Sequence, residues 1–132
     1  MKNDDIIENN KLIAEFLGWE KSEMKLFVPT VSTVYRTIEY YNGEKVVGSF
    51  THPSSMKFHK SWDWLMPIVE KVESMKYVVT ITQNICTIKA SVMGDTTLIT
   101  RQTGNYSTPD TKIYNTWLAL IDFIKWYKEN TE

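Results

Sequence analysis

The dipeptide Asn42-Gly43 is the feature that most limits how this chain folds. It separates two runs rich in β-branched and aromatic residues, Ser32–Tyr41 and Lys45–Phe50. Both residues of the dipeptide tolerate the positive φ angles of a type I′ turn, whose twist matches that of two antiparallel strands. The pattern therefore predicts a β-hairpin, followed by a loop at His52–Ser55.

More strands are predicted in the second half of the chain. Tyr77–Thr82 and Ile85–Val92 alternate apolar with polar side chains, and Gln83-Asn84 lies between them. We favour a second hairpin here over one long bent strand. A turn at Gly94-Asp95 then leads to a further strand at Thr97–Arg101.

An N-terminal helix is predicted before the first hairpin. Asp4 or Asp5 is suited to cap it, and Gly18 is placed to end it in a left-handed C-cap. Trp19–Lys25 is interpreted as a connector, and Pro29 limits any strand before it to a short edge piece. The expected apolar stripe consists of Ile6, Ile7, Ile13, Phe16 and Leu17.

A central helix is predicted to begin after Ser61, whose hydroxyl is suited to accept a bond from a first-turn amide. Pro67 lies too far inside to be an ordinary first-turn proline, so it removes the bond to the Asp63 carbonyl and is expected to bend the helix or loosen its first turn. The expected apolar face has spacings of three and four: Trp62, Leu65, Met66, Val69 and Val72.

The last helix is predicted to start with Thr108 as its cap and Pro109 at its first position. Its expected buried stripe is Ile113, Trp117, Leu120, Ile121, Ile124 and Tyr127. The order of elements predicts one α+β domain over residues 1–132, with a largely antiparallel sheet of about four to five strands and about three helices packed on it, an α/β sandwich.

Composition and charge exclude several classes of protein. The chain is 42% hydrophobic and 23% charged, which is typical of a globular domain, and its net charge of -1 argues against binding to duplex nucleic acid. The single cysteine, Cys86, allows no internal disulfide and no cysteine-based zinc site, and we place it in the core. The acidic, polar N-terminal stretch is unlike a secretory signal, and no apolar run is long enough to cross a bilayer. We expect a cytoplasmic protein.

Four segments carry a resemblance to a known family: SWDWLMPIVEKVE, NKLIAEFLGW, TITQNICTI and FIKWYKEN. In these segments the chain resembles small uncharacterised proteins of Bacteroides-type bacteria and their phages, described as the phage ABA-sandwich domain family. The resemblance covers most of the chain but not Ser32–Phe50. It implies a sheet between helical layers and a phage or mobile-element setting, and it implies no activity, cofactor or site residue.

The residues around the start of the central helix form the candidate ligand site. Basic groups precede a helix N-terminus, which favours anions, and two tryptophans are suited to stack on a flat ring. The ligand that would suit this pattern is a nucleotide or another aromatic anion. The interpretation that we favour is structural: the tryptophans anchor the helix to the sheet while the lysines are solvated. The candidate residues are Lys57, His59, Lys60, Trp62, Asp63, Trp64 and Arg101.

The sequence evidence for catalytic groups is weaker than that for a ligand site. His59 and Asp63 share a helical face only if the helix begins early, and no third metal ligand stands at a diagnostic spacing. His52 beside Ser54 and Ser55 has no elbow glycines, so loop polarity explains these residues. We predict no catalytic residue, no metal and no cofactor.

Two further groups of residues remain open to a structural or a binding interpretation. The loop before the last helix presents polar side chains to a partner or is a plain connector, and it contains Arg101, Asn105, Tyr106 and Asp110. Trp126 and Tyr127 either complete the core or form part of a homodimer face.

The sequence favours a non-enzymatic binding or accessory module of phage or mobile-element origin. Its partner is expected to be a protein, a second copy of the chain or a small anionic ligand. The alternative is a small hydrolase or nucleotide-modifying enzyme that uses His59, Asp63 and also His52. An enzyme gathers such groups in one pocket, whereas a binding module leaves them scattered.

Overall fold

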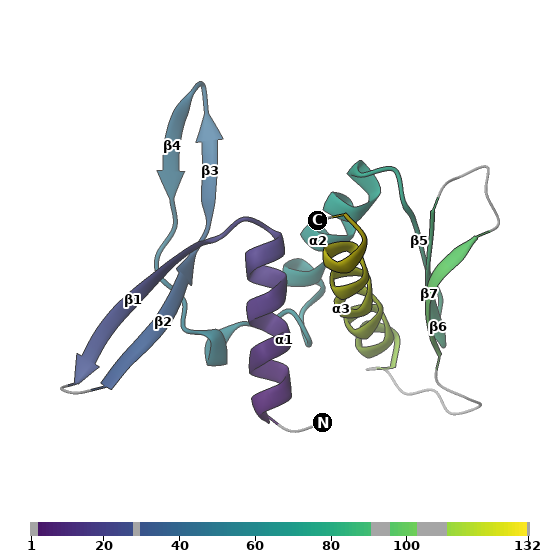
Figure 1. Ribbon diagram of the computed structural model, residues 1–132, viewed down its shortest axis with the longest axis horizontal. Coiled ribbons are helices and arrows are strands. Elements are labelled where there is room, and N and C mark those ends of the chain that lie inside the picture. Colours follow the sequence, from purple (N-terminus) through teal and green to yellow (C-terminus); the bar gives the residue numbers. More distant parts are fainter. Residues whose placement is uncertain (1–2, 28–29, 91–95, 103–110, 132) are drawn as a thin grey trace. The chain divides into compact units, whose positions relative to one another are not determined.

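The computed structural model describes residues 3–27, 30–90, 96–102 and 111–131. The chain forms two compact units, Met1–Met56 and Lys57–Glu132 (Figure 1). The first unit contains α1 (Asn3–Phe16), β1 (Glu20–Phe27), β2 (Thr30–Arg36), β3 (Ile38–Tyr41), β4 (Glu44–Val47) and a short 3-10 helix, η1 (Pro53–Ser55). The second contains α2 (Trp62–Ser74), β5 (Val78–Ile81), β6 (Ile85–Lys89), β7 (Thr97–Gln102) and α3 (Thr111–Thr131).

The predicted α+β class is confirmed, but the arrangement of the strands differs from the prediction. In the described residues the strands form three antiparallel sheets of two, two and three strands, where the sequence predicts one sheet of four to five. The first two sheets arise because β2 pairs with β1, whereas β3 pairs with β4. These partners are adjacent in sequence, so short hairpins satisfy the hydrogen bonds that the prediction assigned to one large sheet.

Helix α1 ends as the sequence predicts. Gly18 has a φ of +82°, its amide donates to the Glu15 carbonyl at 3.0 Å, and the next amide, that of Trp19, donates to the Ala14 carbonyl at 3.0 Å. This pair of bonds is a Schellman motif, which a glycine permits without steric cost. At the other end Asp4 and Asp5 lie in the first turn, inside the helix and not ahead of it, so neither is the predicted cap. Their negative charges interact favourably with the positive end of the helix dipole.

The prediction of a connector after α1 is wrong. Residues Glu20–Phe27 form strand β1, which pairs antiparallel with β2 from Glu20 opposite Arg36 to Phe27 opposite Thr30. The stretch is polar and lacks the β-branched residues that mark a strand in sequence. The partner strand stabilises it, since Arg36 forms an ion pair with Glu20 directly across the ladder.

The hairpin predicted at Asn42-Gly43 is confirmed. Asn42 has a φ of 52° and Gly43 a φ of 84°, and the two residues join Tyr41 to Glu44 across the ladder. The hairpin is shorter than predicted, because the first run is divided. Its part up to Arg36 belongs to β2, and only Ile38–Tyr41 pairs with β4.

Tyr35, near the end of β2, has a pairing partner on each side. On one side it faces Lys21 of β1, and on the other it forms an isolated bridge with Thr51. The Tyr35 amide donates to the Thr51 carbonyl at 3.0 Å, and the Thr51 amide donates to the Tyr35 carbonyl at 2.6 Å. At Tyr35 the backbone of the first unit is therefore three segments wide: β1, β2 and the segment that contains Thr51.

Helix α2 begins after Ser61 as predicted, but the Ser61 side chain makes no capping hydrogen bond. Pro67 lies inside the helix, also as predicted. The buried face differs from the predicted one, because Ile68 is buried whereas Met66 is 37% exposed. The face that packs inward consists of Leu65, Ile68, Val69 and Val72.

The second unit has its helices on a three-stranded sheet in the order β5-β6-β7. The predicted second hairpin is confirmed, with Ile81 opposite Cys86 and the Thr82 amide donating to the Ile85 carbonyl at 2.9 Å. Helix α3 contacts β6 and β7, while α2 contacts β5 and α3. Five of the six residues of the predicted α3 stripe are buried, and the sixth, Tyr127, is half-buried.

Some predictions fall on residues outside the described ranges. They concern the turn at Gly94-Asp95, the cap at Thr108 and Pro109, and the loop residues Asn105, Tyr106 and Asp110. Among the helices that the structure does describe, none is long and apolar enough to cross a membrane.

Candidate functional site

The predicted ligand residues lie around the start of α2, in the second unit. Lys57, Lys60 and Asp63 are exposed, whereas Trp62 is half-buried. Trp64 is also half-buried, and its ring meets the buried ring of Phe58 edge-on with the centroids 5.1 Å apart. This segment thus combines exposed charges with aromatic rings that are partly used in packing.

His59 lies in a turn before α2 and not on the helix itself. The amides of Lys60 and Ser61 donate to the Lys57 carbonyl at 3.1 and 2.9 Å, which closes this turn. The condition for His59 and Asp63 to share a helical face is therefore not met. In the described residues no group of three or more His, Cys, Asp or Glu side chains is placed to hold a metal ion.

The imidazole of His59 packs against an indole. Its ring lies 5.8 Å from that of Trp117, which is fully buried on α3. Burial lowers the pKa of His59 below its usual value, and the nearby charge of Lys60 lowers it further. The neutral imidazole is favoured, which reduces the attraction of this side chain for an anion.

Arg101 is engaged elsewhere in the second unit. Its Nε donates to Asp122 Oδ2 at 2.5 Å, and its Nη2 donates to Asp122 Oδ1 at 3.0 Å. The carboxylate raises the pKa of Arg101, so the guanidinium stays charged. Sequence reasoning missed this partner, which is 21 residues away on α3.

His52 and Ser54 form a local contact in the first unit. His52 Nδ1 lies 2.7 Å from Ser54 Oγ and accepts a bond from the Ser54 amide at 3.2 Å. Both side chains are exposed, and His52 occupies the N-cap of the short helix η1. The contact is accounted for as a helix cap, in agreement with the loop polarity that the sequence indicates.

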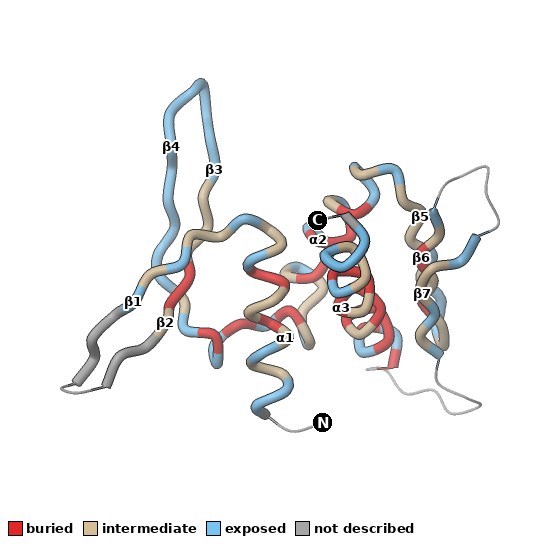
Figure 2. The backbone as a smooth tube through the Cα atoms, viewed as in Figure 1, coloured by how far each residue is buried: buried red, intermediate tan, exposed pale blue. Residues whose placement is uncertain are grey.

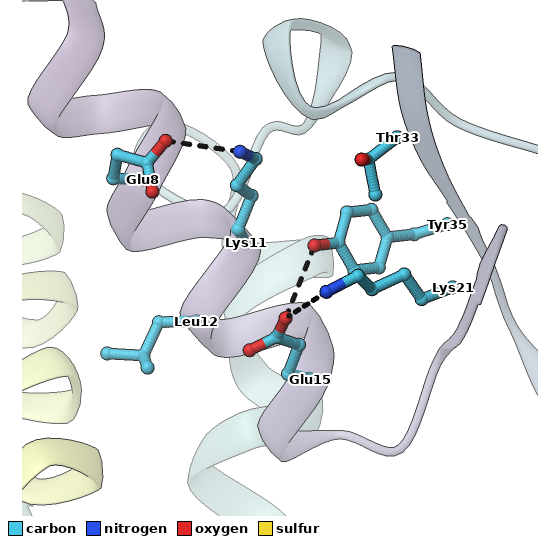
Figure 3. Close-up of a pocket in the computed structure, with 7 residues that line it drawn as sticks. All are labelled: Glu8, Lys11, Leu12, Glu15, Lys21, Thr33 and Tyr35. Atoms are coloured by element: carbon cyan, nitrogen blue, oxygen red, sulfur yellow. Dashed lines mark hydrogen bonds and ion pairs between the residues drawn. The ribbon is translucent and has the colours of Figure 1, made fainter. Parts of the chain in front are cut away.

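A polar pocket of about 260 Å³ lies between α1, β1 and β2 (Figure 3). At its wall the Tyr35 hydroxyl donates to Glu15 Oε1 at 3.3 Å, and Lys21 Nζ lies 3.6 Å from the same oxygen. Lys11 forms an ion pair with Glu8 at 3.1 Å. The charges of the wall balance, and burial raises the pKa of Tyr35 to about 12, so its hydroxyl stays protonated at neutral pH. The pocket is lined by Glu8, Lys11, Leu12, Glu15, Lys21, Thr33 and Tyr35.

Among the described residues, most of the exposed large apolar side chains lie on residues 38–50, which we call the arm. Figure 2 shows exposed residues along β4, the turn and most of β3, whose first residue is half-buried. Of the seven large apolar side chains that are exposed in the described residues, five belong to the arm. They are Tyr40 at 69%, Tyr41 at 59%, Val46 at 46%, Val47 at 40% and Phe50 at 39%.

Two residues of the arm, Lys45 and Phe50, contact charged groups of β1 and β2. Lys45 Nζ lies 3.1 Å from Glu20 Oε2, and Glu20 is also the ion-pair partner of Arg36. These two bonds lower the pKa of Glu20. The Arg36 guanidinium lies over the ring of Phe50, 4.9 Å from its centroid. Because neighbouring residues of a strand point to opposite faces, Tyr40 and Tyr41 place exposed rings on both faces of the two-stranded ladder.

Comparison with known proteins gave no match. No family model matches the chain, and neither the curated proteins nor the solved structures that were searched match it. The resemblance to the phage ABA-sandwich family therefore stays a prediction.

Proposed function

We propose that this chain is a non-enzymatic binding module that associates with a protein through its arm. It is proposed to act in the cytoplasm as an accessory protein of phage or mobile-element origin, and to share the ABA-sandwich architecture of the family it resembles. The single observation that supports the binding role is the concentration of exposed apolar side chains on residues 38–50.

Physical reasoning supports this choice of surface. Exposed apolar patches on soluble proteins mark association sites, and tyrosine is among the residues enriched at such sites. An isolated two-stranded ladder is marginally stable in water. A partner that covers or extends this ladder would add the contacts that it lacks, and the exposed apolar side chains available for them are those of Tyr40, Tyr41, Val46 and Val47.

Site-specific photocrosslinking in the cells that express the chain tests this proposal. A photoreactive phenylalanine analogue replaces Tyr41, which is 59% exposed, and in a matched variant it replaces Tyr114, which is 39% exposed on α3. We expect protein adducts from position 41 and few from position 114. Equal yields at the two positions, or no adduct at position 41, would contradict the proposal.

A small anionic ligand at the start of α2 is a second proposal. Its support is that Lys57 and Lys60 are exposed within a few residues of two half-buried tryptophans. Titration with nucleotides while recording tryptophan fluorescence tests it, with a Lys57→Gln, Lys60→Gln double variant as the control. A signal that stays unchanged up to millimolar nucleotide would exclude this ligand class.

A further inference from the structure

We infer that the partner of the arm is a second copy of the chain, joined by antiparallel pairing of β4 with β4 of the other copy. This inference rests on the proposed binding role of the arm and adds the identity and the register of the partner. It follows from the direction of the backbone groups, from the charges and from the side-chain pattern of β4.

The outer edge of β4 presents backbone groups at two positions. Tyr41 and Glu44 flank the two-residue turn and so form a hydrogen-bonded pair, and further along the Gly48 amide donates to the Thr37 carbonyl at 2.9 Å. Residues 44, 46 and 48 therefore face β3. By the alternation of an antiparallel ladder, Lys45 and Val47 direct their amides and carbonyls to the outer edge.

This edge is only partly protected against pairing, because its two charged residues, Glu44 and Lys45, lie at one end of β4. Natural edge strands are kept apart by charged side chains, bulges or proline. All four residues of β4 are exposed, the β3–β4 register is regular, and the lysine of the strand is drawn towards Glu20 at 3.1 Å. The charge that would repel a second strand is thus partly neutralised within the same chain.

The sequence of β4 selects one register. The outward residues of the two copies must face each other, so Lys45 can lie opposite Val47 of the second copy, with Val46 opposite Val46 at the two-fold axis. A shift by two residues in one direction places Lys45 opposite Lys45. The same shift in the other direction places Val47 opposite Val47 and leaves that as the one pair within β4, because its other pairs use residues beyond Val47, where β4 ends.

In the selected register the two arms form a four-stranded sheet, β3-β4-β4-β3. Val46 meets its own copy at the axis, and Glu44 lies opposite Gly48, which has no side chain to oppose the carboxylate. No like charges lie directly opposite one another. The sheet also passes the three-strand size that gives a ladder independent stability in water.

Disulfide trapping tests the register directly. The only native thiol, Cys86, is fully buried, so a Val46→Cys variant carries one accessible thiol. At the axis the two introduced sulfurs lie within bridging distance, whereas the same change at Val47 places them about two residues apart along the strand. We expect mild oxidation to link Val46→Cys into a covalent dimer much faster than Val47→Cys.

The oligomeric state of unlinked protein provides the second measurement. Val47→Pro removes an outward amide and leaves the bonds to β3 in place, whereas Val47→Thr keeps both the amide and the shape. We expect dimers for the wild type and for Val47→Thr in sedimentation experiments. Association of Val47→Pro should be about tenfold or more weaker, because two symmetric hydrogen bonds are lost. Circular dichroism and thermal unfolding establish that each variant is folded.

Two results overturn this inference. One is a wild-type protein that stays monomeric at every protein concentration used for sedimentation. The other is disulfide formation in Val46→Cys that is no faster than in Val47→Cys. Protein adducts at position 41 that contain a different protein would leave the proposed binding role standing while removing the second copy as partner. Absence of both adducts and dimers would remove both proposals.

Discussion

Arg101 and Asp122 form a two-bond ion pair that joins β7 to α3, with Nε to Oδ2 at 2.5 Å and Nη2 to Oδ1 at 3.0 Å. The paired geometry is specific to arginine, because a lysine ammonium cannot supply two parallel donors. It also explains why an arginine placed by sequence among the ligand residues has a structural role in the second unit.

Replacing this arginine should weaken the second unit modestly. Both side chains are partly exposed, at 43% and 29%, so we expect Arg101→Ala to lower the free energy of unfolding by about 0.5–1 kcal/mol. Arg101→Lys should lose part of that, and high salt should reduce both effects. Denaturant unfolding measures them. A double-mutant cycle with Asp122→Asn is the control, and additive effects in it would show that the pair does not interact.

Pro67 should cost α2 stability. It has no amide to donate to the carbonyl four residues earlier, and its interior position in the helix is the one where proline is least tolerated. We expect Pro67→Ala to raise the free energy of unfolding by about 1–2 kcal/mol, after the loss of the proline's rigidity in the unfolded chain is subtracted. Met66→Ala, at an exposed position of the same helix, is the control and should have little effect.

Lys76 adopts a left-handed backbone conformation just after α2, with a φ of 75°. A side chain other than glycine is strained there, so Lys76→Gly should stabilise the protein by about 1 kcal/mol. The same replacement two residues earlier, Ser74→Gly, falls inside the helix and removes a side-chain bond to the Lys71 carbonyl. Thermal unfolding should therefore shift in opposite directions for the two variants, and a shift in the same direction would contradict the assigned strain.

Tyr35 should make stability depend on pH in the alkaline range. Burial raises its pKa from 10.0 to about 12, and the negative charge of Glu15 adds to the effect. Between these values the unfolded chain loses the proton that the native protein keeps, so stability is full below pH 10 and falls as the pH rises towards 12. Unfolding midpoints across this range measure the slope. Tyr35→Phe should flatten it, and Glu15→Gln should reduce it.

The thiol of Cys86 should be unreactive towards thiol reagents in the folded protein. Its side chain is 0% exposed, and burial raises the pKa of the thiol to about 11, so little thiolate forms at neutral pH. A thiol reagent at pH 8 should react with native protein far more slowly than with protein in denaturant. Equal rates in the two states would contradict the burial of this residue.

Local signals were predicted well from the sequence. The Asn42-Gly43 turn, the Gly18 helix end and the start of α2 after Ser61 depend on backbone preferences of one or two residues. Strand β1 was missed because it becomes a strand through its pairing with β2, which composition does not encode. The buried face of α2 contains Leu65, Val69 and Val72 as predicted, but Ile68 takes the place of Met66, because tertiary contacts with β5 and α3 decide which side of the helix is covered.

The candidate site was predicted less completely, because its side chains also depend on contacts between residues that are distant in sequence. The residues from Lys57 to Trp64 form a real local cluster at the start of a helix, but sequence does not reveal that His59 rests on Trp117 or that Arg101 is held by Asp122. Trp62, Trp64 and Trp126, left open between core and surface, are all half-buried. The exposure of the arm among the described residues depends on tertiary packing, which no short sequence pattern reports.

The turn at the tip of the arm is also a site where the protein is expected to deamidate. Asn42 is exposed and is followed by a glycine whose backbone nitrogen no side chain shields, an arrangement in which asparagine slowly cyclises and loses ammonia. Aged preparations should therefore accumulate an acidic isoform whose added negative charge the variant Asn42→Asp imitates. Because that new carboxylate lies two residues from Glu44, ageing would change the charge of the surface through which we propose that the molecule associates.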